Sequence, residues 1–271
     1  MSTITKNRGI DAASYVRELM SRGRYTFTLE EATSVLKVSK IAARASFRRL
    51  KAKGFIAMPI RGFCVVVPPE YTTLSCLPAD QFIAELMHFL KAPYYIGLLS
   101  AAELHGAAHQ KPQEFQVITS HNRKMIVCGR VTIRFVARKD IEKVPTVSMN
   151  TPRGYIQVST PEATAFDLLL YPEYAGGLSN VATVLSELCE KITPIKLRQA
   201  VVYVPNISSI QRAGFIFDRI LKKKELANSL EKVVRKKGKA IVPLMASGVR
   251  KGVEIDRKWN LFVNEKVDPD V

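Results

Sequence analysis

The amino-acid sequence predicts an α+β protein that divides into two domains. Its 271 residues exceed the length of about 150 residues that is usual for one domain. Helical and β-prone segments alternate along the chain, and 47% apolar residues are sufficient for a packed core. Two consecutive prolines, Pro68 and Pro69, end a β-prone run and place the domain boundary at about residues 70–80. We expect an N-terminal domain over residues 1–75 and a C-terminal domain over residues 76–271.

Positive charge is concentrated at the two ends of the chain. The formal net charge is +17, from 41 Lys and Arg against 24 Asp and Glu. Residues 1–75 carry +8 and residues 193–271 carry +9, whereas residues 76–192 are neutral. A charge excess of this size is typical of proteins that bind polyanions. We therefore divide the C-terminal domain into a neutral α+β part, 76–192, and a basic helical tail, 193–271.

Several other protein classes do not fit the composition. The longest apolar stretches are much shorter than the roughly 20 residues of a membrane span, and the first ten residues lack the apolar core of a signal peptide. The cysteines are too widely spaced for a disulfide framework or a zinc site; they are Cys64, Cys76, Cys128 and Cys189. We expect a soluble, cytoplasmic protein in which these cysteines are small core residues.

Capping signals predict three helices in the N-terminal domain. Residues 11–23 carry an apolar stripe and end at a glycine. Residues 28–36 begin with Thr28 and have a glutamate three residues later, which is the pattern of a capping box. After a three-residue turn, Ser39 is placed to cap a third helix over residues 40–53.

A β-hairpin is predicted directly after the third helix. Residues 55–58 and 63–67 are apolar and β-prone, and residues 59–62 between them contain proline and glycine. Two helices, a tight turn, a third helix and a hairpin form the order of a winged helix-turn-helix. The sequence therefore predicts such a module at the N-terminus.

The third helix has one apolar and one basic stripe. At 100° per residue, Ala43, Phe47 and Leu50 share a face, and the cations fall on a neighbouring one. A helix of this kind can enter the major groove of DNA, where arginine pairs with guanine. Ser39 would lie near the bases, and Arg61 at the hairpin tip would reach a phosphate or the minor groove. The predicted contacts to double-stranded DNA are Ser39, Lys40, Arg44, Arg48, Lys51 and Arg61. The alternatives are a solvated helix face and a module that contacts protein.

Helical and β-prone segments are mixed in the C-terminal domain. Helices are predicted at 80–91, 94–106, 163–170 and 178–191, and strands at 115–119, 124–127, 131–136 and 154–158. The helix at 163–170 has the clearest start, because Thr160, Pro161 and Glu162 supply a cap, a first-turn proline and an acid. In the tail we predict helices at 195–203, 209–223 and 225–237, and a terminal strand at 259–263.

Basic residues cluster at two helix ends in the predicted tail. They form either a secondary patch for a polyanion or solvated helix ends that the helix dipole favours. The residues are Lys222, Lys223, Lys224, Arg235, Lys236 and Lys237.

Convincing catalytic constellations are missing from the sequence. His105 and His109 have the spacing of two metal ligands on a helix, but no glutamate follows His105. Asp140 and Glu142 lie beside basic residues and have no further aspartate at a strand end to complete a metal site. We therefore predict no enzymatic activity, no metal site and no cofactor.

Three segments carry a resemblance to a known family. They are Tyr95–Gly106, Ser159–Leu168 and Arg257–Asn264, and they follow the N-terminal winged helix in order. With this order and spacing, nearly the whole chain resembles an AbiEi-type antitoxin, a transcriptional regulator of type IV toxin–antitoxin systems for abortive phage infection.

The resemblance implies a function that the residues alone do not show. Such an antitoxin represses its own operon through inverted repeats in the promoter and opposes an AbiEii-type nucleotidyltransferase toxin. The winged helix would bind the DNA, and the C-terminal domain would be needed to neutralise the toxin. The alternative is a nucleic-acid-processing enzyme whose basic ends guide the substrate to a site in the middle domain.

Overall fold

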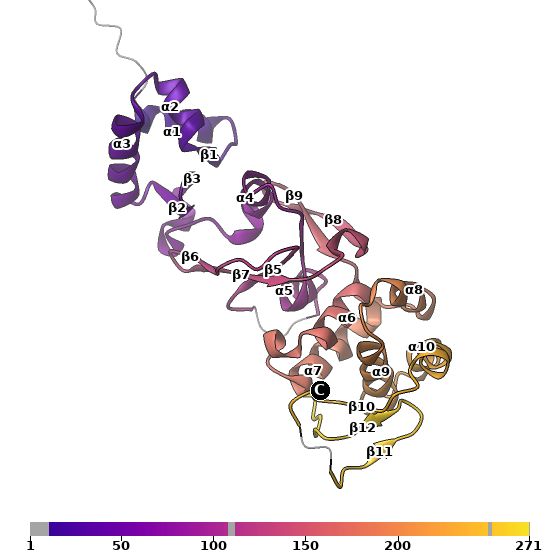
Figure 1. Ribbon diagram of the computed structural model, residues 1–271. Helices are drawn as coiled ribbons and strands as arrows, with labels where there is room; N and C mark the ends of the chain where they lie inside the picture. Colours follow the sequence, from indigo (N-terminus) through magenta and orange to yellow (C-terminus); the bar gives the residue numbers. More distant parts are fainter. Residues whose placement is uncertain (1–10, 108–111, 249–250, 271) are drawn as a thin grey trace, which may run out of the picture.

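The computed structural model describes residues 11–107, 112–248 and 251–270. Three helices and a small sheet form one end of the molecule (Figure 1). The side chains of Asp11, Thr28 and Ser39 cap the helices by accepting backbone N–H bonds. The predicted helices and hairpin are therefore present. The elements are α1 Ala12–Ser21, α2 Leu29–Leu36, α3 Lys40–Ala52, β1 Thr26–Thr28, β2 Ile56–Ile60 and β3 Phe63–Val66, and the antiparallel strands lie in the order β1-β3-β2.

Strand β3 is buried on both faces. Cys64 and Val66 belong to the core formed with α1, α2 and α3. Phe63 and Val65 point to the opposite side and belong to a second core, which contains residues of the middle of the chain. Because side chains alternate along a strand, the hairpin joins the N-terminal helices to the next part of the protein.

A six-stranded mixed sheet occupies the middle of the molecule, in the order β6-β7-β5-β4-β9-β8. Pairs β4·β9 and β5·β7 are parallel, and the other neighbours are antiparallel. At one edge, β6 contacts β2 of the hairpin. The strands are β4 Tyr94–Ile96, β5 Phe115–Thr119, β6 Ile126–Cys128, β7 Val131–Ala137, β8 Thr146–Thr151 and β9 Gly154–Ser159.

The predicted helix at 94–106 is wrong in its first part. Tyr94–Ile96 form strand β4, and the helix α5 covers only Leu98–Leu104. Gly97 separates them at a point where an added Cβ would lie 2.6 Å from Ile118 Cγ1. Two further differences concern strands: β6 lies two residues later than the predicted start at residue 124, and β8 was not predicted because its residues are mainly polar.

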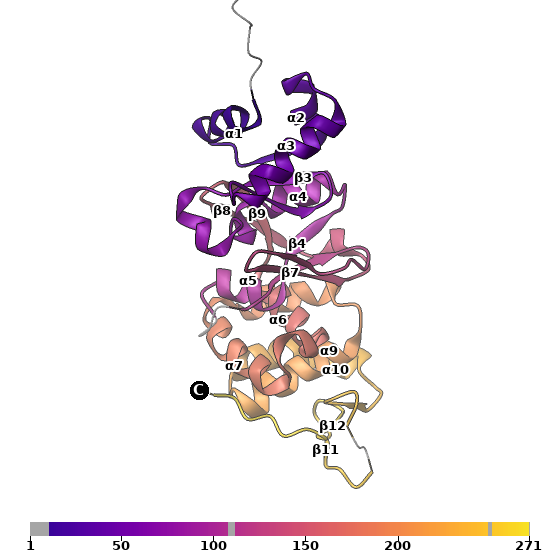
Figure 2. The same ribbon diagram turned by 90° about the vertical axis from the view of Figure 1, so that its left-hand side faces the viewer.

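Helices of the middle and the tail pack together at the far end of the molecule (Figures 1 and 2). One large core extends from Tyr95 in β4 to Leu261 near the C-terminus. The helices at this end are α6 Pro161–Leu170, α7 Leu178–Leu188, α8 Pro194–Ala200, α9 Ile207–Phe215 and α10 Lys224–Lys237. Helix α4, Ile83–Phe89, lies instead beside the hairpin and shares a core with Phe63 and Val65. Shorter 3₁₀ segments are Pro69–Leu74, Ala79–Gln81, Ile141–Lys143, Pro172–Ala175, Cys189–Lys191 and Val201–Tyr203, and a π segment covers Ile216–Ile220.

The tail is helical only as far as α10. Beyond Lys237 three short strands form a sheet in the order β10-β12-β11, where the sequence predicted a single strand. They are β10 Val242–Pro243, β11 Ile255–Asp256 and β12 Leu261–Phe262. The four cysteines are free and buried, as expected for small core residues.

Two buried carboxylates, Asp167 and Asp218, connect separate segments of the chain between β4 and Trp259. Asp167 in α6 pairs with Arg138 after β7 and accepts a 2.8 Å bond from the Tyr95 hydroxyl. Burial raises the pKa of Asp167, and Arg138 and Tyr95 oppose this effect. Asp218 accepts bonds from Lys224 Nζ at 2.6 Å and Trp259 Nε1 at 3.1 Å. Burial would raise the pKa of Asp218, but these bonds and Lys258 hold it well below the usual range.

The packing of Trp259 on α9 gives a stability prediction. An added Cβ on Gly214 would lie 1.9 Å from Trp259 Cζ3, and Trp259 is fully buried. We expect Gly214→Ala to lower the free energy of unfolding by about 1–3 kcal/mol through overpacking. Urea unfolding of the full chain measures this change. The exposed Asn228→Ala in α10 is the control and should change stability by less than about 0.5 kcal/mol; an equally small effect at Gly214 would contradict the packing.

Candidate nucleic-acid interface

Helix α3 presents the basic stripe to solvent. Ala43, Phe47 and Leu50 are buried against α1, α2 and the hairpin. On the other side, all four predicted cations of the helix are exposed; they are Lys40, Arg44, Arg48 and Lys51. Burial of the apolar stripe therefore fixes the direction in which the cations point.

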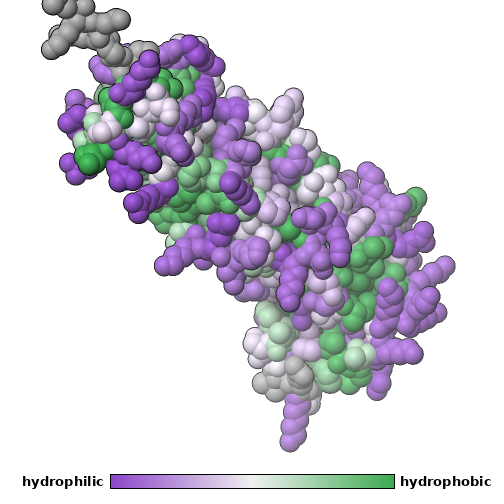
Figure 3. All heavy atoms as spheres, turned by 45° about the horizontal axis from the view of Figure 1, so that its top comes forward, coloured by the Kyte–Doolittle hydropathy of each residue, from purple (hydrophilic) through white to green (hydrophobic). Residues whose placement is uncertain are grey.

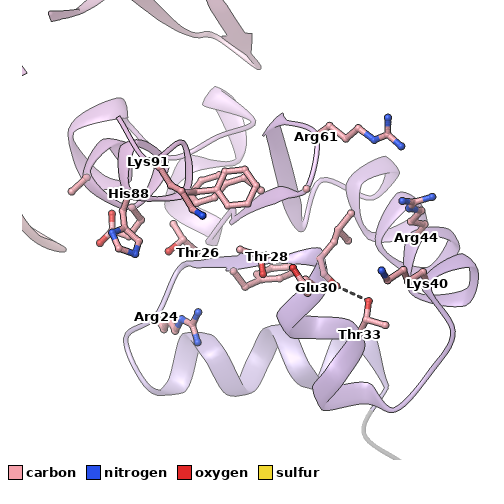
Figure 4. Close-up of a pocket in the computed structure, with 17 residues that line it drawn as sticks. Arg24, Thr26, Thr28, Glu30, Thr33, Lys40, Arg44, Arg61, His88 and Lys91 are labelled. Atoms are coloured by element: carbon pink, nitrogen blue, oxygen red, sulfur yellow. Dashed lines mark hydrogen bonds between the residues drawn. The ribbon is translucent and has the colours of Figure 1, made fainter. Parts of the chain in front are cut away.

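A groove of about 1000 Å³ lies beside the N-terminal half of α3 (Figure 4). Lys40 and Arg44 line it from α3, and Arg61 lines it from the β2–β3 turn. Three of the predicted contact residues therefore lie around one concave surface. Arg48 and Lys51 are further along α3 and do not line the groove, while Ser39 caps the helix with its Oγ 3.2 Å from the Ala42 nitrogen.

Helix α4 forms the opposite wall of this groove. Phe89 of α4 packs on Phe63 of β3, with 5.5 Å between the ring centroids. His88 and Lys91 also line the groove from this side, as Figure 4 shows. The wall belongs to the middle of the chain, so the groove forms only when the hairpin and α4 pack together.

A polar cluster fixes the N-terminal unit, which consists of α1 to α3 and β1 to β3, against the central sheet. The Arg153 guanidinium, in the β8–β9 turn, lies over the ring of Tyr25, 3.3 Å from its centroid. Arg153 Nε also donates to Gln81 Oε1 at 2.7 Å, and Gln81 donates to the Tyr71 hydroxyl at 2.8 Å. These contacts connect three segments that are far apart in the sequence.

Three basic residues of the groove were not among the predicted contacts. Arg24 precedes β1 and pairs with Glu31, and the hydrogen bonds between them raise the pKa of Arg24. His88 is exposed near the end of α4, and Lys91 follows this helix with a left-handed φ of 50°. Only the apposition of α4 and the hairpin brings His88 and Lys91 to the groove, so spacing along the sequence could not reveal them.

The groove carries more cationic than anionic side chains. Its lining contains the cations Arg24, Lys40, Arg44, Arg61 and Lys91, and two acids, Glu30 and Glu85. In the view of Figure 3, hydrophilic side chains project widely from the N-terminal end of the molecule. An exposed surface of this charge attracts phosphate groups.

The two basic clusters of the tail lie at opposite ends of α10. Lys222 and Lys223 precede the helix, Lys224 begins it, and the other cluster forms its last turn. Lys224 and Lys237 are 13 positions apart on the helix, which corresponds to about 20 Å along its axis. All four of Lys224, Arg235, Lys236 and Lys237 are exposed. Lys224 pairs with Asp218, and Arg235 pairs with Glu231. Figures 1 and 2 place α10 far from α3, so a role for this patch stays a prediction.

The residues considered for metal chemistry do not come together. His105 is buried and its Nε2 lies 2.7 Å from the Ser159 carbonyl oxygen, while His109 is outside the described residues. Burial lowers the pKa of His105. Asp140 and Glu142 are exposed, and Asp140 pairs with Lys143. Over residues 11–107, 112–248 and 251–270, no three His, Cys, Asp or Glu side chains form a group that could hold a metal ion.

Residues 95–219 match the family model of the AbiEi antitoxin C-terminal domain. This part of the chain is an AbiEi antitoxin domain. The domain extends from β4 to the π segment after α9 and contains most of the central sheet and the Asp167 pair. The family resemblance found in the sequence is therefore confirmed.

A solved structure shares the fold of this chain. The RV2827C protein from Mycobacterium tuberculosis has a TM-score of 0.64 and 15% identity, with 94% of each chain covered. An antigenic nucleotidyltransferase-like protein from Paracoccidioides brasiliensis has a TM-score of 0.32 and 11% identity, over 59% of this chain and 87% of that one. No curated protein matches the sequence. None of the helices in the described ranges is long and apolar enough to span a membrane.

Proposed function

We propose that this AbiEi antitoxin is also a DNA-binding repressor of its own operon. In this proposal the N-terminal unit is a winged helix-turn-helix that binds inverted repeats in the promoter. The C-terminal domain, residues 76–271, opposes an AbiEii-type nucleotidyltransferase toxin during phage infection. The observation that carries the DNA-binding part is the row of exposed cations on α3. Two of them, Lys40 and Arg44, line one groove together with Arg61 and Lys91.

The geometry of α3 supports entry into a major groove. A recognition helix needs one face packed on its own domain and one face free to meet base edges and phosphates. Buried Phe47 and exposed Arg44 and Arg48 satisfy both conditions. Helix α3 carries five cations and no acidic residue, so no negative charge on the helix itself would repel the phosphates.

Repression and toxin antagonism would use different ends of the molecule. The antitoxin domain lies over residues 95–219, outside the N-terminal unit that carries α3. Figure 1 shows the helices of this domain at the opposite end from α3. The lack of enzymatic activity stays a prediction, and a metal-dependent nuclease assay on the purified chain tests it.

Removal of the α3 arginines tests the recognition helix. We expect Arg44→Ala and Arg48→Ala each to weaken promoter binding by about 1–3 kcal/mol if the arginine reads a base, with relaxed specificity at that position. Both side chains are exposed, so the fold should persist. Titration of a labelled promoter fragment measures affinity at several salt concentrations, and the unmodified chain should give a log–log slope of about −5 or steeper. If the double variant binds the promoter as tightly as the unmodified chain, α3 is not part of the DNA interface.

Lys91 tests whether α4 takes part in the same DNA contact. We expect Lys91→Asn to weaken binding equally on all sequences and to make the salt slope shallower by about 1, because one phosphate contact is lost. Asparagine tolerates the left-handed backbone that Lys91 adopts, so stability should be little changed. Lys139→Asn removes an exposed charge elsewhere and serves as the control. An effect no larger than that of the control would confine the interface to α3 and the hairpin.

Separate functions predict separable phenotypes in the full-length protein. Cells that express the toxin from an independent promoter should still be rescued by the Arg44→Ala/Arg48→Ala double variant, because the antitoxin domain is unchanged. The same variant should fail to repress a reporter under the native promoter. If the double variant loses both rescue and repression at equal protein levels, the separation is contradicted. Toxin antagonism would then depend on the N-terminal unit or on DNA binding.

A further inference from the structure

An exposed isoleucine stands in the middle of the outward face of α3. Ile41 is 80% exposed. At 100° per residue it lies about 20° from Arg48 and about 60° from Arg44 around the helix axis, on the side away from the buried Phe47. Val38, three residues earlier, is also exposed, at 40%. An apolar side chain therefore occupies the centre of a basic surface.

The fold of the isolated chain does not account for this isoleucine. Ile41 is outside the buried clusters, so it contributes little to the core. A β-branched residue is also a poorer helix former than lysine, arginine or glutamate, which would be accepted at an exposed position. A contact with a bound partner would give this exposed apolar side chain a role.

The neighbours of Ile41 leave room for a close approach. Ala42 and Ala45 lie beside it on the surface, one exposed and one half-buried, and neither extends beyond Ile41. Ile41 is the second residue of α3, and the first turn of a recognition helix reaches deepest toward the base edges. The flanking arginines would meet phosphates or guanines at the sides of the same contact.

We propose that Ile41 reads thymine in the operator by packing on the 5-methyl group. This inference rests on the proposed DNA binding and adds a sequence preference to it. In the major groove the thymine methyl is the apolar feature of the base edges, and it distinguishes T·A from the other base pairs. A protein partner would instead need an apolar point surrounded by acidic groups.

Deletion of single methyl groups from the DNA tests the contact. The probe is the native promoter fragment with thymines replaced one at a time by deoxyuridine, which lacks only the 5-methyl group. We expect the unmodified full-length chain to bind one or two of these fragments about fourfold more weakly, the effect of one buried methyl. Ile41→Ala should bind the thymine fragment more weakly and should lose its sensitivity to deoxyuridine at those positions.

The controls separate this inference from the proposed function. Val202→Ala shortens an equally exposed side chain, 81% accessible, in the tail and should bind every fragment like the unmodified chain. If the unmodified chain binds all fragments equally, or if Ile41→Ala keeps the full deoxyuridine effect, the thymine contact is overturned while DNA binding by Arg44 and Arg48 stands. Failure of the unmodified chain to bind its promoter would overturn both.

Discussion

The two-sided burial of strand β3 is the constraint on which the arrangement of the whole protein depends. Cys64 and Val66 enter the core of the N-terminal helices, and Phe63 and Val65 enter the core under the central sheet. Each of these four side chains is at most 2% exposed. Separation of the two parts would expose both apolar faces to water at a cost of about 25 cal/mol per Å². The N-terminal unit is therefore held in one orientation by the hydrophobic effect.

This constraint shapes the candidate interface. Because Phe63 packs on Phe89, α4 closes the groove beside α3 and adds Lys91 to its cations. The stacking of Arg153 on Tyr25 also connects the β8–β9 turn to the segment before β1 and supports the same orientation. A surface that is formed before binding loses less conformational entropy when DNA binds. The AbiEi domain contains most of the central sheet, and its helices α6 to α9 pack in a core that does not include the N-terminal helices.

Local signals in the sequence predicted local structure well. The caps at Thr28 and Ser39 and the apolar stripe of Phe47 are confirmed, because such features depend on neighbouring residues only. The strand at Tyr94–Ile96 was taken for helix, since its pairing with β5 involves residues more than 20 positions away. Lys91 and His88 were missed as groove residues for the same reason. The uninterrupted apolar run at residues 63–67 does carry a sign of burial on both faces, because a strand with one wet face would alternate.

The central claim is that α3 lies in the major groove of the promoter. Methylation interference with dimethyl sulfate tests this most directly, because guanine is methylated at N7 in the major groove and adenine at N3 in the minor groove. The full-length chain should be excluded from promoter fragments methylated at guanine N7 within each inverted repeat, where arginine would donate to N7 and O6. Interference at adenine N3 alone, or at no position, would contradict the placement of α3 in the major groove.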